Sequence, residues 1–188
     1  MNVVSHYLNS MGGFMLLALP IWILLRTLWL MCKQQSPRWG RELLLVFFVL
    51  YLIGLASQTL TIPPSLFSDP QAIIARAMQR WETGHGISLT PGYTIRSMLE
   101  KGSYGQKVIN LAGNVLIFAP LGVLPPLLWK RWRHLWAAVP LSAGVSSLIE
   151  FLQLFLGRSV DVDDVILNTL GGLLGFLLFC LIPKKLKK

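Results

Sequence analysis

The polar side chains that could do chemistry lie in the C-terminal half of the chain, inside or beside long apolar segments. They are carboxylates, amides and one arginine, namely Asn110, Asn114, Glu150, Gln153, Arg158, Asp161, Asp164 and Asn168. An ionised group costs about 2.5–3.5 kcal/mol at the centre of a membrane helix, so it usually faces the protein interior and finds a partner. We therefore predict a ligand-binding site from these residues. An ion pair of Glu150 with Arg158 or Arg96 is the structural alternative.

Two helical segments each carry a pair of polar residues on one face. Asn110 and Asn114 are four residues apart, and Glu150 and Gln153 are three apart. Either spacing puts both side chains on the same side of a helix. Amides in membrane helices often form hydrogen bonds between helices, and that role is the alternative for the two asparagines.

A third segment combines acids, an amide and glycines near one face. Asp161, Asp164 and Asn168 follow each other at spacings of three and four. Gly171 and Gly175 continue close to this face as a GxxxG pair, which is typical of close helix contact. The pair would also permit a homodimer.

The acids of this third segment have further interpretations. Acids in a first helical turn suit the positive N-terminal dipole, so capping is the alternative for Asp161 and Asp163. Asp163 lies off the polar stripe and is expected to be solvated. Glu150, Asp161 and Asp164 could together hold a divalent cation, which prefers oxygen ligands. No known metal-loop spacing is present, so no cofactor is assigned.

The composition indicates a membrane protein. Of the 188 residues, 54% are hydrophobic and 13% are charged, about half the charged share of a soluble domain, and the mean hydropathy is +0.59. Five apolar runs approach the ~20 residues that cross ~30 Å of hydrocarbon, where the backbone must be helical. They cover residues 12–31, 43–60, 108–129, 135–156 and 165–182. Four prolines are expected to kink or shorten the third and fourth runs: Pro120, Pro125, Pro126 and Pro140.

The predicted fold is therefore all-α: a polytopic transmembrane bundle that forms a single domain over residues 1–188. Residues 61–107 form its one sizeable loop. Apolar residues recur at helical spacing over residues 73–81, which predicts a short amphipathic helix with Asp69 as its N-cap. This helix lies on the outer membrane surface or packs over the bundle mouth. The rest of the loop, to Gly105, is expected to be irregular.

The basic residues predict the orientation. The net charge is +9. The lysines and arginines form short clusters beside apolar runs, a pattern typical of topology signals and lipid contacts and not of a nucleic-acid surface. If five spans alternate, one side carries ten basic residues: Lys33, Arg38, Arg41, Lys130, Arg131, Arg133, Lys184, Lys185, Lys187 and Lys188. This side is predicted to be cytoplasmic, with the N-terminus outside.

The two cysteines offer neither a metal motif nor a disulfide framework. Cys32 and Cys180 each lie at the end of an apolar run, and both are expected to be buried small hydrophobic residues. No basic residue precedes Arg26, so the first run is expected to be a retained helix and not a secretory signal.

Three segments match motifs of a known family. They read NLAGNVLIFAPLG from Asn110, SLIEFLQ from Ser147 and GRSVDVDDVILNTLGG from Gly157. In order and spacing they resemble the VanZ-like family of small polytopic bacterial membrane proteins, over residues 108–179. The motif positions carried over are Asn114, Phe118, Pro120, Glu150, Gln153, Arg158, Asp161, Asp164 and Asn168.

The resemblance implies a bacterial cytoplasmic membrane and a context, low-level resistance to the lipid-tailed glycopeptide teicoplanin, without a reaction. The predicted function is to bind or modulate a lipid-linked cell-wall precursor or the lipoglycopeptide at the outer leaflet, among membrane lipids. Arg158 would pair with phosphate or carboxylate. A membrane-embedded enzyme acting on a lipid phosphate with a metal ion is one alternative. A small lipid transporter or flippase is another, although no internal repeat is found.

Overall fold

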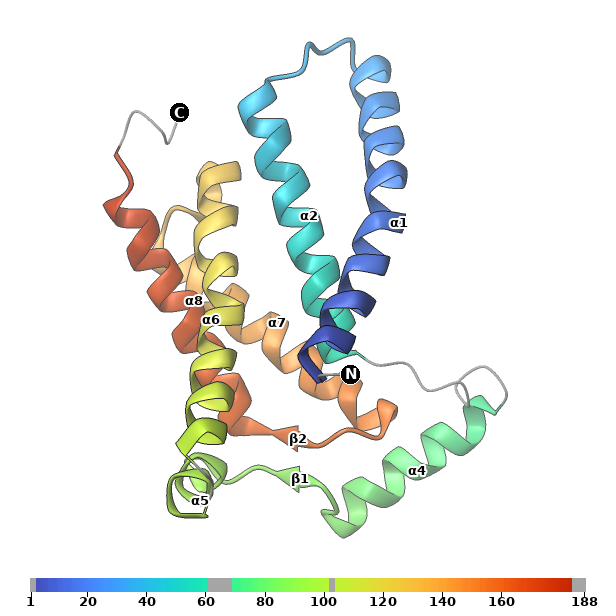
Figure 1. Ribbon diagram of the computed structural model, residues 1–188, viewed down its shortest axis with the longest axis vertical. Coiled ribbons are helices and arrows are strands. Elements are labelled where there is room, and N and C mark those ends of the chain that lie inside the picture. The colour runs from blue at the N-terminus through green and yellow to red at the C-terminus, as the bar shows by residue number, and fades with distance from the viewer. Residues whose placement is uncertain (1–2, 61–68, 102–103, 184–188) are drawn as a thin grey trace. The chain divides into compact units, whose positions relative to one another are not determined.

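The computed structural model describes residues 3–60, 69–101 and 104–183 (Figure 1). The chain divides into two compact units, Met1–Thr59 and Leu60–Lys188. The first unit is a helical hairpin of α1 (Val3–Cys32) and α2 (Trp39–Thr59). The first residues of the predicted loop, 61–68, and the lysines at 184–188 lie outside the described residues.

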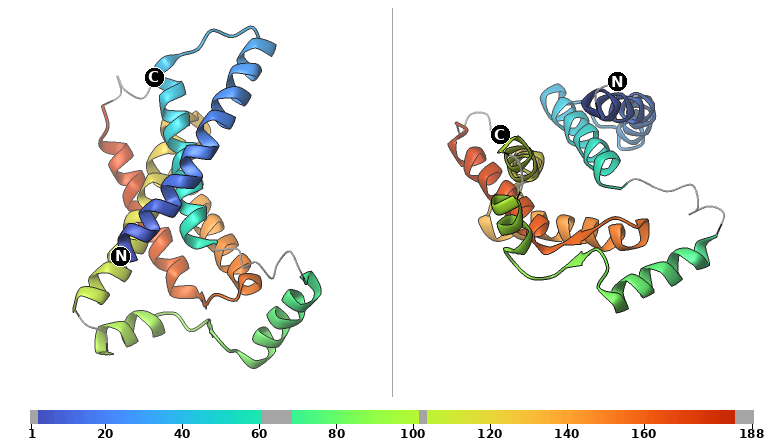
Figure 2. Two further views of the ribbon diagram at one scale, coloured as in Figure 1. Left: turned by 45° about the vertical axis from the view of Figure 1, so that its right-hand side comes forward. Right: turned by 60° about the horizontal axis from the view of Figure 1, so that its bottom comes forward.

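The second unit contains three long helices and a group of short elements. In chain order these are α4 (Pro70–Thr83), β1 (Ile87–Ser88), α5 (Tyr93–Lys101), α6 (Tyr104–Leu128), the 3-10 turn η1 (Lys130–Trp132), α7 (Leu135–Leu156), β2 (Val160–Asp161) and α8 (Val162–Leu181). β1 pairs with β2 in parallel, with Ile87 opposite Val160 and Ser88 opposite Asp161. Figures 1 and 2 show α4, α5 and both strands at the end of the unit where α6 and α8 begin and α7 ends.

Five helices of the described residues are long and apolar enough to cross a membrane, which confirms the predicted all-α polytopic bundle. They are Gly12–Cys32, Trp39–Thr59, Ile109–Leu128, Leu135–Leu156 and Val162–Leu181. The prolines do not shorten the helices, because α6 continues through three prolines and α7 through Pro140. The alternative, that they kink these helices, stays a prediction. In a membrane bundle, neighbouring helices and local adjustments can satisfy the carbonyls that a proline leaves without a donor.

The loop between the second and third spans is more ordered than expected. The predicted amphipathic helix is present as α4, and Asp69 caps it by accepting a 3.0 Å hydrogen bond from the Ala72 N–H. Gly84 ends it in the left-handed conformation, with φ of 68°. The expectation of an irregular segment to Gly105 is wrong, because α5 occupies Tyr93–Lys101. Contacts from α8, described below, stabilise the start of this helix.

Glycines let α8 pack directly on the backbone of α6. A Cβ on Gly171 would overlap the carbonyl of Val115, and one on Gly175 would overlap that of Ala119. Gly122 on α6 likewise has no room for a Cβ against α8. The GxxxG pair is therefore used inside the chain, and the predicted homodimer would need another surface.

The cysteines are placed differently from the expectation. Cys32 and Cys180 are both exposed, so the prediction that they are buried is wrong. Each lies on a membrane-length helix, α1 and α8, where an exposed apolar side chain can face lipid.

One ion pair joins the two helices of the hairpin, and the sequence reasoning missed it. Arg26 of α1 donates from Nε and Nη2 to the two carboxylate oxygens of Glu42 of α2, at 2.7 and 2.8 Å. The side chains are 19% and 15% exposed. Arg26 also lies over the ring of Trp29, 4.4 Å from its centroid. A two-point pair of this kind fixes the alignment of α1 on α2.

We expect Glu42→Gln to lower the stability of the purified protein by about 1–3 kcal/mol, because Arg26 would keep its charge without a carboxylate partner. The double exchange Arg26→Glu with Glu42→Arg should recover part of this loss, since it restores opposite charges. Thermal unfolding in one detergent measures all three variants. A double variant no more stable than Glu42→Gln would show that the pair does not hold the hairpin.

Candidate functional site

The candidate residues belong to the end of the second unit where β1 pairs with β2. α7 ends at Leu156, Gly157 turns the chain in the left-handed conformation with φ of 75°, and α8 starts at Val162. Val160 also donates its N–H to the carbonyl of Gly86 at 2.9 Å. This short turn brings the acids before and inside α8 close to the end of α7.

Asp163 is the most fully enclosed acid, and the expectation that it is solvated is wrong. It is 1% exposed. Its Oδ1 accepts from the N–H of Gly92 at 2.5 Å, and its Oδ2 accepts from those of Thr94 and Ile95 at 2.8 and 3.0 Å. These N–H groups lie at the start of α5, where a helix lacks intrahelical acceptors. Asp163 therefore caps a helix that precedes it by about 70 residues.

Glu150 and Asp161 connect α7 to the turn before α8. Glu150 is 6% exposed, and its Oε2 accepts the N–H of Asp161 at 2.8 Å. The Asp161 side chain caps α8 by accepting the N–H of Asp163 at 2.9 Å, which agrees with the capping alternative. Arg96 pairs instead with Glu100, at 2.8 Å. The alternative partnership of Glu150 with Arg96 is therefore wrong.

Asn114 and Asp164 join α6 to α8. The Nδ2 of Asn114 donates to Oδ1 of Asp164 at 2.6 Å. This contact agrees with both predicted roles of Asn114, as part of a ligand-binding site and as a hydrogen-bonded link between helices. Asn110, one turn earlier on α6, is exposed. Among the described residues, no hydrogen bond joins its side chain to the other candidates.

Asn168 and Gln153 are the buried amides of the group. Asn168 is 6% and Gln153 7% exposed. The Nδ2 of Asn168 donates to Oγ of Ser146 on α7 at 2.9 Å, whereas its Oδ1 is buried without a hydrogen-bond partner in the described residues. The carbonyl of Gln153 accepts the N–H of Arg158 at 3.0 Å, which closes the end of α7.

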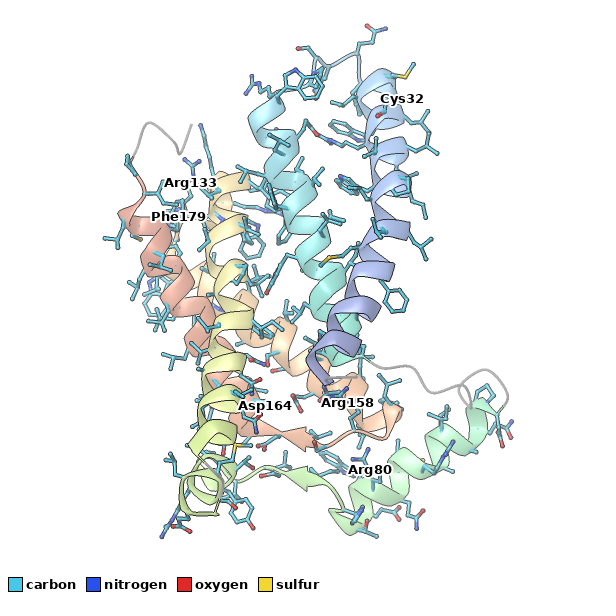
Figure 3. All side chains as sticks on the ribbon, viewed as in Figure 1. Cys32, Arg80, Arg133, Arg158, Asp164 and Phe179 are labelled. Carbon is cyan, nitrogen blue, oxygen red and sulfur yellow. The ribbon has the colours of Figure 1, made fainter. Side chains whose placement is uncertain are left out.

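The charged members of the group come close together. Asp161, Asp164 and Arg158 all lie near enough to Glu150 to act on its charge. The Arg158 side chain is exposed at this end of the unit, while Asp164 is partly buried beside α6 (Figure 3). No group of three or more His, Cys, Asp or Glu suited to a metal ion occurs in the described residues. A cation held by Glu150, Asp161 and Asp164 thus stays a prediction.

The α4 helix packs over this end through one arginine. Nη1 of Arg80 donates to the carbonyl of Leu154 at 2.9 Å, and Nη2 donates to that of Arg158 at 2.6 Å. A cation at the last carbonyls of α7 is favoured by the helix dipole. Ile73 and Ala77 of α4 are buried. The face of α4 that carries them therefore packs on the protein, as the second of the two predicted alternatives requires.

A cavity of about 290 Å³ lies between α4 and the end of α7. Its lining includes Arg76, Gln79 and Arg80 from α4, and Leu154, Phe155 and Leu156 from α7. Neither Arg76 nor Arg80 forms an ion pair with an acid of the described residues. The cavity thus combines two positive charges with an apolar wall.

The family model described as VanZ/LLP1 matches residues 43–183, three quarters of the chain. The chain belongs to the VanZ/LLP1 family. No curated protein and no solved structure matches the chain. The family match confirms the resemblance and extends it, since it begins in α2 and includes the whole loop that carries α4 and α5.

In this VanZ/LLP1 protein, sequence reasoning missed Arg76, Arg80 and the true position of Asp163. Both arginines are charged residues of an amphipathic helix, and such residues normally meet solvent. The sequence did contain a signal for Arg76: no acidic residue lies three or four positions from it on α4, so it has no intrahelical ion-pair partner. No comparable signal marks Asp163, whose partners are backbone groups distant in sequence.

Proposed function

We propose that this protein binds or modulates a lipid-linked component of the bacterial cell envelope at the outer leaflet of the cytoplasmic membrane. Low-level resistance of the teicoplanin type would follow from this binding. The observation that carries the proposal is the cavity between α4 and α7, with its two arginines and its apolar wall. An anionic head group joined to a lipid chain has the complementary chemistry.

Arg76 is proposed as the direct ligand of the head group. Its Nε donates to the carbonyl of Ala72 at 3.0 Å, which holds the guanidinium against α4. Its two Nη groups are then available for a phosphate or carboxylate, which guanidinium binds through two parallel hydrogen bonds. Arg80 is a positioning residue, because its Nη groups donate to the carbonyl of Leu154 in α7 and to that of Arg158 in the following turn, while its charge remains beside the cavity. Arg158 is a second proposed cation for the head group.

The carboxylates and amides are proposed to hold this cavity in shape. Glu150 fixes Asp161, and Asn114 fixes Asp164. These contacts favour binding over acid–base catalysis, since each acid already serves a contact between elements. Enzyme and transporter functions stay alternatives without a specific observation in their favour.

The proposed orientation puts α4 and the cavity outside the cell. Within the second unit, η1 with Lys130 and Arg131 connects the end of α6 to the start of α7. These helix ends lie opposite to the end of the unit that carries α4 and the cavity (Figure 1). This basic turn would face the cytoplasm under the positive-inside rule. On α4, Ile74, Met78 and Trp81 are 52%, 60% and 60% exposed, which supports contact of that face with the outer leaflet.

Drug susceptibility of bacteria that express the chain tests the proposal. We expect Arg76→Gln to return teicoplanin susceptibility to that of cells lacking the chain, because the proposed anion ligand is lost. Arg96→Gln is the matched control: it removes one positive charge from the same loop, at a side chain that is 81% exposed. Resistance that survives Arg76→Gln at equal membrane abundance would overturn the proposal.

A further inference from the structure

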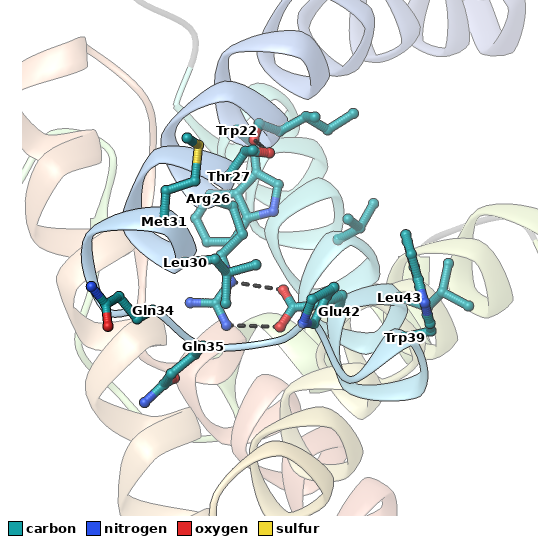
Figure 4. Close-up of a pocket in the computed structure, with 13 residues that line it drawn as sticks. Trp22, Arg26, Thr27, Leu30, Met31, Gln34, Gln35, Trp39, Glu42 and Leu43 are labelled. Carbon is teal, nitrogen blue, oxygen red and sulfur yellow. Dashed lines mark hydrogen bonds and ion pairs between the residues drawn. The ribbon is translucent and has the colours of Figure 1, made fainter.

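The first unit contains two adjoining cavities at the loop end of the α1–α2 hairpin. One, of about 690 Å³, is lined mainly by apolar and aromatic side chains, including Trp22, Leu30 and Leu43 (Figure 4). The other, of about 460 Å³, is lined by polar and basic residues, including Ser36, Arg38 and Arg41. Arg26, Leu30, Gln34, Gln35 and Glu42 line both. An apolar space and a basic space therefore meet in one place.

The basic cavity has an excess of positive charge. Its one acid, Glu42, accepts two hydrogen bonds from Arg26 and so is neutralised by it (Figure 4). Arg41 lies near enough to act on Glu42 as well, but neither Arg38 nor Arg41 forms an ion pair within the described part of the chain. The start of α2, at Trp39, adds the positive end of a helix dipole.

We propose that the loop end of this hairpin binds one anionic glycerophospholipid, with its phosphate at Arg38 and Arg41 and an acyl chain in the cavity lined by Trp22 and Leu43. The apolar cavity adjoining the arginines favours a lipid over a free phosphate, because a free phosphate has no apolar part that could fill this cavity. The Arg26–Glu42 pair forms the boundary between the two parts, since both residues line both cavities. Trp39 also lines the apolar cavity, and tryptophan favours the level of lipid head groups.

This lipid site is separate from the proposed outer-leaflet cavity, because all its residues lie in the first unit. Each proposal can therefore fail without the other. The proposed ligand of the hairpin is a lipid of the host membrane. Substitutions in this site are therefore expected to change which lipids the protein binds and not the drug susceptibility of the cells.

Native mass spectrometry of the full-length protein in equimolar phosphatidylglycerol and phosphatidylcholine, with identical acyl chains, tests the site. We expect bound phosphatidylglycerol to exceed bound phosphatidylcholine. The variant Arg38→Gln/Arg41→Gln should reduce this preference by about fivefold for each arginine removed. Lys130→Gln/Arg131→Gln, which removes equal charge from another turn, should retain it. An unchanged preference in the first variant, or an equal loss in the control, would overturn the proposal.

A second arm separates a lipid from a free phosphate. Glycerol 3-phosphate carries the phosphate without an acyl chain, so millimolar concentrations should leave the bound phosphatidylglycerol in place. Retention would support use of the apolar cavity. Displacement would show that phosphate alone accounts for binding, and it would contradict the proposed lipid site.

Discussion

Asp163→Ala is expected to lower the stability of the protein by about 3 kcal/mol or more, because a carboxylate that accepts three backbone hydrogen bonds is removed. The substitution would leave the N–H groups of Gly92, Thr94 and Ile95 without their carboxylate acceptor. It should also release α5 from α8, so that the segment around Gly92 becomes open to proteolysis. Thermal unfolding and limited proteolysis of the detergent-purified protein measure both effects.

Asp69→Ala is the matched control for Asp163. Asp69 is also a capping carboxylate, but it accepts one N–H, that of Ala72, at an exposed position. Its loss should cost about 1 kcal/mol, as for an ordinary N-cap. Equal effects of the two substitutions would show that burial and the additional hydrogen bonds of Asp163 do not matter.

Gly175→Leu is expected to prevent the close packing of α8 on α6. Even a Cβ at this position would overlap the Ala119 carbonyl, and backbone atoms cannot move aside as a flexible side chain can. Overpacking of a core typically costs about 1–3 kcal/mol, and a clash with backbone should reach or exceed the upper end of that range. The expected result is a large loss of folded protein, measured by size-exclusion chromatography after mild solubilisation.

Gly144→Leu provides the comparison for Gly175→Leu. Gly144 lies on α7, and a Cβ there meets nothing within 4 Å. This substitution should leave the yield of folded protein close to that of the wild type. If Gly144→Leu were as harmful as Gly175→Leu, helix composition and not the α6–α8 contact would explain the loss.

The membrane-spanning helices could be predicted from the sequence because their length and hydropathy decide the outcome. Residue type and helical spacing assigned Asn114 and Asp164 to one predicted site, and the structure joins them by a hydrogen bond. Spacing along a helix is a local property, so it also gave Asp69 as a cap of α4.

Long-range pairing with the backbone could not be predicted from spacing. Asp163 accepts N–H groups some 70 residues away, and Arg80 donates to carbonyls at the end of α7 and in the following turn, more than 70 residues away. Any residue type supplies such backbone partners, so no motif marks them. The Arg26–Glu42 pair was predictable in principle, because opposite charges near the facing ends of two consecutive spans can meet in a hairpin.

Arg76 and Arg80 are proposed to form a site for an anionic lipid head group. The most direct test measures how tightly the purified full-length protein binds a polyprenyl phosphate and the matching uncharged polyprenol. The phosphate should bind about tenfold or more tightly than the alcohol, since a hydrogen bond to a charged group contributes about 1.5–3 kcal/mol. Arg76→Gln should remove most of this difference, and Arg96→Gln should keep it. Equal binding of phosphate and alcohol to the wild type, or an undiminished difference in Arg76→Gln, would contradict the site.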